Sequence, residues 1–500
     1  MTMNQKTFLP APKFSLNDIN ESILKAEYAI RGTIPNRAEE LDIQLLENSK
    51  SLPFAKIVYA NIGNPQQLDQ QPLTFQRQVM SLVQFPDLLK SKDILLAQKI
   101  YSKDSIERAT KLLNSIGGSV GAYSSSQGVL DIRKNVARFI LKRDLHHDPT
   151  QDLIDETASN VFLTAGASTA VDHILPLFAK DESCGVLLPI PQYPLYTAAV
   201  TLQKSKLLPY YLNESNNWST DPKQIEQIVI DAIKQNIKPT TLVVINPGNP
   251  TGAILTKDSI IDIIDIAAEY GIVIIADEVY QENVYEAFEF HSFKKVLSEL
   301  RKNYPSKYDN VQLASLHSIS KGVNGECGQR GGYMEITGFS NDVKKVLLKV
   351  ASISICSVVT GQILVDLMVN PPQPGDESYE LDQLERSVIH SNLILKSNTL
   401  YDVFTRLPGI SCQKPQGAMY LFPRLHLSEN AINAATELNL KPDEFYCLKL
   451  LENTGICTVP GSGFGQYPGT YHLRTTFLPP GIEWINSWEK FHLEFMEKYK

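Results

Sequence analysis

The stretch Gly271-Ile-Val-Ile-Ile-Ala-Asp277-Glu278 decides the fold that this sequence predicts. An unbroken apolar run of this length is typical of a strand that is buried on both faces of a sheet. Asp262, Asp265 and Glu269, which precede the run, are spaced so that they share one face of a helix. A helix that leads into a doubly buried strand is the repeating unit of a mainly parallel sheet.

Four further short apolar runs, separated by amphipathic helical patterns, extend this interpretation along the chain. They are residues 161–164, 185–190, 241–245 and 311–315. The pattern predicts an α/β fold whose sheet is covered by helices on both faces. The proline-rich residues 370–378 predict a linker, and residues 380–407 predict one long helix. We therefore expect an N-terminal arm and part of a small domain in residues 1–104, a large domain in 105–385, and the rest of the small domain in 386–500.

Composition excludes several classes of function. The 500 residues are 43% hydrophobic and 20% charged, which is typical of a folded globular chain. The net charge of −8 offers no broad basic field for nucleic acid or an anionic membrane. Six cysteines without a CxxC pair suit a reducing compartment. Because the first 20 residues contain neither a signal-peptide core nor an arginine, and no apolar run could span a bilayer, we expect a cytoplasmic protein.

Polar residues follow several of the predicted strands, where an open α/β sheet usually binds its ligand. Residues 165–169 form a small-residue turn before a helix, which suits an anion but is also an ordinary helix start. Asn249 lies in the loop after residues 241–245. Asp277 ends the central run, where a buried carboxylate requires a cation unless it only caps the next helix.

Lys321 has the most unusual surroundings. Ser318 and Ser320 precede it closely, and Arg330 follows nine positions later in a glycine-rich segment. Packing alone does not explain an amine, two hydroxyls and a guanidinium in this order. They predict a site that holds a ligand covalently by its carbonyl group and electrostatically by its phosphate.

With these residues in place, the sequence resembles the pyridoxal-phosphate aminotransferases of fold type I, and within them the alanine aminotransferase subgroup. The order Asn249, Asp277, Tyr280, Lys321, Arg330 is the specific part of the resemblance. Nearly the whole chain takes part, through residues 26–31, 61–66, 121–123, 189–196, 461–465 and 472–474. Ser125 and Val323 depart from the subgroup's pattern, which bears on substrate preference more than on cofactor binding.

The resemblance implies a role for each residue around pyridoxal 5′-phosphate. Lys321 forms an imine with the cofactor and later moves the substrate's proton, while Asp277 holds the proton on the ring nitrogen. Tyr280 and Asn249 donate to the phenolic oxygen, and Tyr193 stacks on the ring. The phosphate is assigned to the backbone of Ala167 and Ser168, to Ser318 and Arg330, and to Tyr123 of a partner subunit, which implies a homodimer.

For the substrate, the resemblance implies that Arg474 binds the α-carboxylate, with Asn249 and the Gly63 backbone as helpers. The expected reaction converts L-alanine and 2-oxoglutarate to pyruvate and L-glutamate with ping-pong kinetics. Two alternatives stay open: an aminotransferase that prefers aromatic substrates or kynurenine, and a cofactor-binding protein with little turnover and a regulatory role. No metal ion is expected, because His146 and His147 lie next to each other in a polar loop and point apart.

Overall fold

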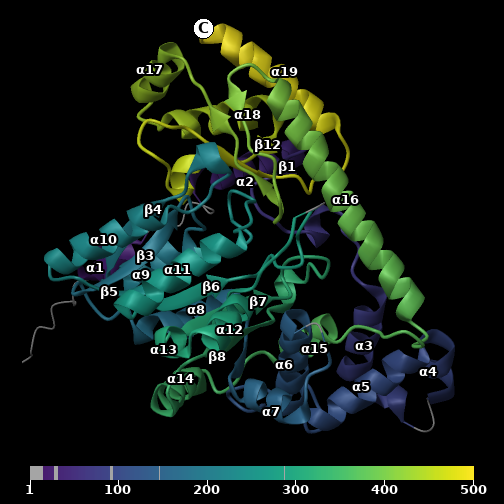
Figure 1. Cartoon of the computed structure of the whole chain (residues 1–500). Helices are drawn as coiled ribbons and strands as arrows, with labels where there is room; N and C mark the ends of the chain where they lie inside the picture. The colour runs from purple at the N-terminus through teal and green to yellow at the C-terminus, as the bar shows by residue number, and fades with distance from the viewer. Residues whose placement is uncertain (1–14, 27–31, 91–93, 146, 286–287) are drawn as a thin grey trace, which may run out of the picture.

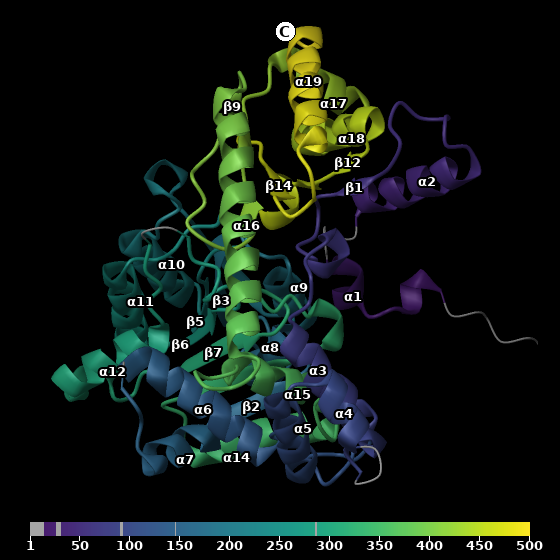
Figure 2. The ribbon, with the colours of Figure 1, turned by 90° about the vertical axis from the view of Figure 1, so that its right-hand side faces the viewer.

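The computed structural model describes residues 15–26, 32–90, 94–145, 147–285 and 288–500. Figure 1 shows a lower part built around a large sheet and an upper part that contains the C-terminus. Helix α16 (Tyr379–Arg406) runs from one part to the other, as Figure 2 shows from the side. It matches the long helix predicted for residues 380–407, and the expected boundary at 385 falls inside it. None of the described helices is long and apolar enough to cross a membrane.

The large sheet has seven strands, and its strand order confirms the α/β prediction. The order is β2 (Val161–Thr164), β8 (Gly332–Thr337), β7 (Leu313–Ser318), β6 (Val273–Asp277), β5 (Lys238–Ile245), β3 (Cys184–Ile190) and β4 (Lys206–Tyr211). The five neighbours from β7 to β4 pair in parallel, whereas β8 is antiparallel to both β7 and β2. All five predicted strands are present. β4 and β8 were not predicted, because β4 is a half-exposed edge strand and Glu335 interrupts the apolar residues of β8.

Helices cover both faces of the sheet. One face packs against α10 (Pro222–Lys234), α11 (Lys257–Tyr270), α12 (Phe293–Asn303) and α13 (Pro305–Tyr308). The other packs against α8 (Ala167–Ile174), α9 (Leu195–Leu202) and α14 (Asn341–Ile353). Ile274 and Ala276 of β6 belong to the first cluster and Ile275 to the second. Since side chains alternate along a strand, Asp277 is directed to the α8 and α9 face.

A helical layer lies beyond the β2 edge of the sheet. It consists of α3 (Thr74–Gln84), α4 (Ile94–Ile100), α5 (Lys103–Ser115), α6 (Leu130–Leu145), α7 (Gln151–Ser159) and α15 (Val359–Val369). The buried face of α3, which includes Phe75, Val79 and Leu82, shares one hydrophobic cluster with α5, α6 and α15. The apolar face of this helix is therefore buried against helices of residues 105–385, although the division expected from the sequence places it with the small domain. The division as a whole stays a prediction.

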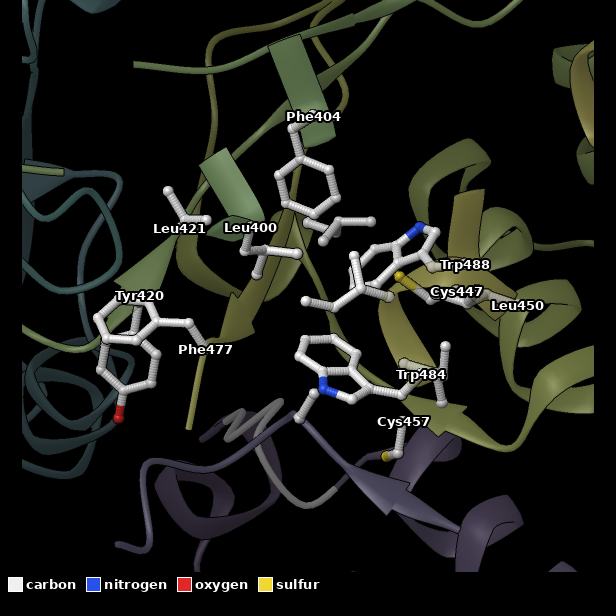
Figure 3. Close-up of a cluster of buried hydrophobic side chains, with 14 of the residues drawn as sticks. Leu400, Phe404, Tyr420, Leu421, Cys447, Leu450, Cys457, Phe477, Trp484 and Trp488 are labelled. Atoms are coloured by element: carbon white, nitrogen blue, oxygen red, sulfur yellow. The ribbon is translucent and has the colours of Figure 1, made fainter. Parts of the chain in front are cut away.

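The upper part combines both ends of the chain. Strand β1 (Val58–Tyr59) pairs in parallel with β12 (Ile456–Cys457), and α2 (Thr33–Glu47) packs in the same hydrophobic cluster as α16, α18 (Pro442–Thr454) and α19 (Glu483–Lys498). Figure 3 shows Phe404, Trp484 and Trp488 in this cluster. The short elements of this part are α17 (Glu429–Glu437), β9 (Ile410–Ser411), β11 (Arg424–Leu425) and β13 (Val459–Pro460). Helix α1 (Glu21–Lys25) lies instead beside α9 in the lower part (Figure 1).

The pairing of β10 (Tyr420–Leu421) with β14 (Leu473–Thr476) positions one side of the site. The two strands are antiparallel, with Tyr420 opposite Thr476, and β13 pairs with the other edge of β14. This small sheet brings Arg474 of β14 close to Tyr420 of β10. Both residues come from the C-terminal quarter of the chain, yet they contact residues that follow strands of the large sheet.

Candidate active site

A cavity of about 230 Å³ lies beyond the carboxyl ends of β5, β6 and β7. Ten of the twelve residues predicted for the site line it: Gly63, Ala167, Ser168, Tyr193, Asn249, Asp277, Tyr280, Ser318, Lys321 and Arg330. The wall also contains the apolar residues Ile62, Leu195, Ile245 and Val279, and the polar residues Asn64, Ser320 and Cys327. The strand ends of the sheet and a loop near the N-terminus therefore bring the predicted residues together.

One end of the cavity is built to hold an anion. Helix α8 begins at Ala167, directly after Gly166, whose φ of 87° is a left-handed conformation that suits glycine. The Arg330 guanidinium donates to the Ala165 carbonyl at 3.1 Å and to the Ser168 hydroxyl at 3.4 Å. A Cβ atom on Gly166 would lie 2.7 Å from that guanidinium, so a larger residue would displace it. The helix N-terminus and the arginine thus face the same space, which favours a phosphate group.

Ser318 adds a hydroxyl to the same wall. Its Oγ donates to the Gly331 carbonyl at 3.2 Å and lies 3.0 Å from the Ser320 Oγ. Because Ser318 ends β7 and has the same orientation in the sheet as Asp277, both side chains reach the α8 and α9 face.

Asp277 lies elsewhere in the cavity wall and is buried. The Tyr196 hydroxyl donates to its Oδ2 at 2.8 Å, and the Val279 N–H donates to its Oδ1 at 3.4 Å. Burial raises the pKa of Asp277, and these two hydrogen bonds together with the Lys321 charge partly offset the rise. A carboxylate in this position would gain most from a cationic partner, which a protonated ring nitrogen supplies.

Lys321 and Tyr280 approach each other at the cavity. The Lys321 Nζ lies 5.8 Å from the centre of the Tyr280 ring. Burial raises the pKa of Tyr280 well above its ordinary value, so its hydroxyl keeps its proton and can act as a donor. The ring of Tyr420 meets the Tyr280 ring edge-on, with centroids 6.2 Å apart and planes at 83°.

Arg474 is buried next to the cavity and contacts it through Asn249. Its guanidinium donates to the Asn249 Oδ1 at 3.1 Å and to the Asn61 carbonyl. The guanidinium carbon lies 4.2 Å from the Tyr420 ring centre and 4.6 Å from that of Phe464. Arg474 does not line the cavity itself and is only 1% exposed. A charged group buried to this extent favours an anionic partner.

The predicted phosphate residue Tyr123 and the two departures from the subgroup's pattern, Ser125 and Val323, lie away from these contacts. Tyr123 does not line the cavity, and its side chain is 77% exposed in the single chain. The carbonyl of Ser125 accepts a hydrogen bond from the Gly128 N–H at 2.8 Å. The carbonyl of Val323 accepts one from the Gln70 side chain at 2.9 Å. Residues 27–31, part of one segment of the resemblance, lie outside the described residues.

Sequence reasoning missed three aromatic residues that contact the predicted ones. Tyr196 lies at the start of α9, three positions after Tyr193, and its N–H donates to the Tyr193 carbonyl at 3.4 Å, which keeps the two residues close together. Tyr420 and Phe464 lie in an apolar run and a glycine-rich turn, both typical of structural positions. The pairing of β10 with β14 brings Tyr420 beside Arg474, and the pairing of β13 with β14 brings in Phe464, which follows β13 by four residues.

The donors and acceptors of the cavity fit pyridoxal 5′-phosphate. An amine, a carboxylate, a phenol and an anion cradle face one cavity, and each has a counterpart on that cofactor. Within the described ranges, no group of three or more histidine, cysteine, aspartate or glutamate side chains could hold a metal ion. His146, named with His147 above, lies outside those ranges.

Comparison with known proteins finds alanine aminotransferases among the proteins similar to this chain. The mitochondrial alanine aminotransferase of Saccharomyces cerevisiae is 60% identical over 494 residues, which cover 99% of this chain and 82% of that protein. A protein of the same species named inactive alanine aminotransferase is 57% identical over 500 residues, with 100% and 97% covered. The solved structure of an alanine aminotransferase from Pyrococcus furiosus superposes with a TM-score of 0.72 at 25% identity, covering 96% of this chain and 100% of that one.

The expected cytoplasmic location is wrong by the same comparison. The 60% identical relative is named mitochondrial, as are relatives from Dictyostelium discoideum at 47% and Arabidopsis thaliana at 44% identity. The expectation rested on the missing arginine in the first 20 residues, and such a local charge pattern is a weak guide to targeting.

The family relationship rests on a match that spans most of the chain. The model of the family described as aminotransferase class I and II matches residues 91–481, which include every predicted site residue except Gly63. From this match and the identity to its relatives over nearly the full length, the chain belongs to the aminotransferase class I and II family.

Proposed function

We propose that this protein is a pyridoxal-phosphate-dependent alanine aminotransferase that converts L-alanine and 2-oxoglutarate to pyruvate and L-glutamate. The observation that supports it most is the single cavity onto which the Lys321 amine, the Asp277 carboxylate and the Arg330 anion cradle all open. The names of the relatives support alanine as the amino donor. An aromatic or kynurenine preference has no such support.

When bound, the cofactor supplies an electron sink for the bond between Cα and its hydrogen. Lys321 would hold the cofactor's carbonyl carbon and, once released by the incoming amino acid, carry the Cα proton. Asp277 would keep the ring nitrogen protonated, and Tyr280 would donate to the phenolic oxygen. Arg474 would bind the substrate carboxylate with two N–H groups and so orient the Cα hydrogen toward the lysine.

Initial rates with four amino donors test the substrate assignment. With 2-oxoglutarate as acceptor, we expect L-alanine to give a higher kcat/KM than L-aspartate, L-phenylalanine or L-kynurenine. A preference for any of the other three would contradict the assignment to alanine. The product should be pyruvate, measured with a lactate dehydrogenase coupled assay.

A half-reaction separates catalysis from cofactor binding alone, which matters because one relative is named inactive. Mixing the cofactor-loaded protein with L-alanine and no acceptor should remove the visible absorbance of the lysine-bound cofactor and release one pyruvate per site. Lys321→Ala should bind the cofactor without this absorbance and produce no pyruvate. Wild-type absorbance that L-alanine leaves unchanged would contradict the proposed activity.

We also propose that the protein is a homodimer in which Tyr123 reaches the phosphate site of the partner subunit. The high exposure of this tyrosine in the single chain supports a role outside its own cavity. Mixed subunits test the proposal, because a dimer of Lys321→Ala with Tyr123→Ala contains one complete site. Refolding the two variants together should restore activity that neither has alone. Absence of restoration in a sample shown to contain mixed dimers would contradict a shared site.

For the domains, we propose that the small domain comprises residues 386–500 together with the N-terminal strand and helix that pack on them. The parallel pairing of β1 with β12 and the cluster shared by α2, α18 and α19 support this division. Residues 74–84 are assigned to the large domain because of the packing of α3.

A further inference from the structure

Tyr420 lies between two groups to which the proposed function gives separate tasks. Its ring contacts the Arg474 guanidinium, 4.2 Å from the ring centre, and meets the Tyr280 ring edge-on at 6.2 Å. Arg474 is the proposed carboxylate clamp, and Tyr280 the proposed donor to the cofactor. In the described residues, Tyr420 is the side chain whose ring meets both of them.

The hydroxyl group of Tyr420 is directed to the site although its ring belongs to the hydrophobic core. Figure 3 shows Tyr420 at the edge of the cluster, with its oxygen pointing away from Trp484 and Trp488. A Cβ atom on Gly63, which lines the cavity, would overlap this hydroxyl. The side chain is only 2% exposed, so its position is fixed by packing on all sides.

The charges around this hydroxyl give it an unusual environment. Burial by itself raises the pKa of Tyr420, but the positive charges of Lys321 and Arg474 and side-chain hydrogen bonding with Tyr280 bring it below its ordinary value. Cys327 is the other titratable group that acts on it, in the opposite direction. Burial, followed by the neighbouring Tyr420, raises the pKa of Tyr280, so its hydroxyl keeps its proton.

We propose that Tyr420 is a positioning residue that links the carboxylate clamp Arg474 to the Tyr280 hydroxyl and thereby controls protonation of the imine formed by Lys321. This inference rests on the proposed function. Tyr280 would donate its hydrogen bond to the phenolic oxygen of a bound cofactor, because that oxygen carries negative charge and would be a stronger acceptor than a neutral phenol. Tyr420 then donates to Tyr280 and makes it a stronger donor, because hydrogen bonds in a chain polarise one another.

Two substitutions separate the hydroxyl from the ring. Tyr420→Phe removes the donor to Tyr280 and keeps the ring under Arg474. Tyr420→Leu removes both. The matched control is Tyr446→Phe, which deletes the hydroxyl of another buried tyrosine of the same core, one that is bonded to His492 at 2.9 Å and Trp488 at 3.1 Å.

The first measurement is a pH titration of the visible absorbance of the cofactor-loaded protein without substrate. Tyr420→Phe should raise the midpoint by about 0.5 to 1 unit, the size expected for the loss of one hydrogen bond that favours the deprotonated imine. Tyr446→Phe should leave the midpoint unchanged. An unchanged or lowered midpoint in Tyr420→Phe would overturn the role of the hydroxyl. If the hydroxyl had only a structural role, its removal would leave the midpoint unchanged.

The second measurement is the affinity for propionate, which has the carboxylate of alanine and no amino group to react. Tyr420→Phe should bind it within about twofold of wild type, and Tyr420→Leu about tenfold more weakly, because the desolvated cation–π contact is lost. Equal affinity in Tyr420→Leu would overturn the link to Arg474. If Tyr420→Leu fails to fold, the titration of Tyr420→Phe still tests the proposed role of the Tyr420 hydroxyl. Failure of the proposed function would show separately, as wild-type absorbance that L-alanine leaves unchanged.

Discussion

The Tyr196 hydroxyl donates a hydrogen bond to the Oδ2 of Asp277 at 2.8 Å, and both side chains are buried. Tyr196 lies at the start of α9 and Asp277 at the end of β6, 81 positions later. Burial raises the pKa of Asp277, and this bond partly offsets the rise by stabilising the charged carboxylate. The cofactor's ring nitrogen would therefore meet a carboxylate that is already oriented.

Tyr196→Phe should weaken this support without changing the fold. A hydrogen bond to a charged group contributes about 1.5–3 kcal/mol, so we expect kcat for L-alanine to fall about tenfold or more, with weaker cofactor binding. Tyr210→Phe is the matched control, because its buried hydroxyl donates to the Val243 carbonyl at 2.8 Å, away from the cavity. Equal losses in the two variants would contradict the specific role of Tyr196.

Replacement of Arg474 should affect substrate binding while the cofactor still binds. In Arg474→Met we expect kcat/KM for L-alanine to fall about a hundredfold or more, since a buried charge pair loses one partner. The visible absorbance of the loaded protein should persist. Arg424→Met, which removes an arginine that contacts Glu214 at 3.5 Å outside the cavity, should retain most of the activity. Loss of cofactor absorbance in Arg474→Met would point to a structural role instead.

Gly63→Ala should reduce activity through steric overlap. The new methyl group would overlap the Tyr420 hydroxyl and approach the Met419 sulfur to 2.6 Å. Overpacking of this kind typically costs about 1–3 kcal/mol, so we expect a lower unfolding temperature and a higher KM for L-alanine. Gly328→Ala is the control, because its added methyl group meets no atom within 4 Å. An unchanged KM in Gly63→Ala would show that the loop moves freely.

His317 should make the protein sensitive to acid. It is 2% exposed, neither ring nitrogen has a hydrogen-bond partner, and Glu282 lies 3.9 Å away. Burial lowers the pKa of His317 to about 3, with a further contribution from Arg143. The unfolded chain, with a pKa near 6.5, binds the proton more readily, so this residue reduces stability as the pH falls from about 6.5 to 3.

His317→Phe tests this linkage. The new ring would keep the stack against Phe139, whose centroid lies 6.4 Å from that of His317. We expect the unfolding temperature near pH 7 to change little and its decrease between pH 6.5 and 4 to become smaller. His147→Gln replaces an exposed histidine and should leave the decrease unchanged. An identical decrease in His317→Phe and wild type would contradict the assignment.

The sequence by itself determined the central part of this protein. Residues 273–277 form a short run of mainly β-branched residues after Gly271, which favours a buried strand because the run is too short for a typical helix. The long helix α16 was also predicted from the sequence alone. Because the strands are parallel, their carboxyl ends meet at one edge, and the residues that follow them, Asn249, Asp277 and Lys321, were expected to share a site.

Only the tertiary structure decided what surrounds those residues. Tyr196 contacts Asp277, 81 positions away, and Tyr420 contacts Tyr280, 140 positions away, in both cases through packing between separate elements. Nothing in the local pattern of residues 418–422 distinguishes a site residue from a residue of an ordinary core strand. The same holds for α3, whose apolar face indicates burial without naming the surface that covers it. Local periodicity specifies which side chains are buried, whereas the chain topology specifies against what they are buried.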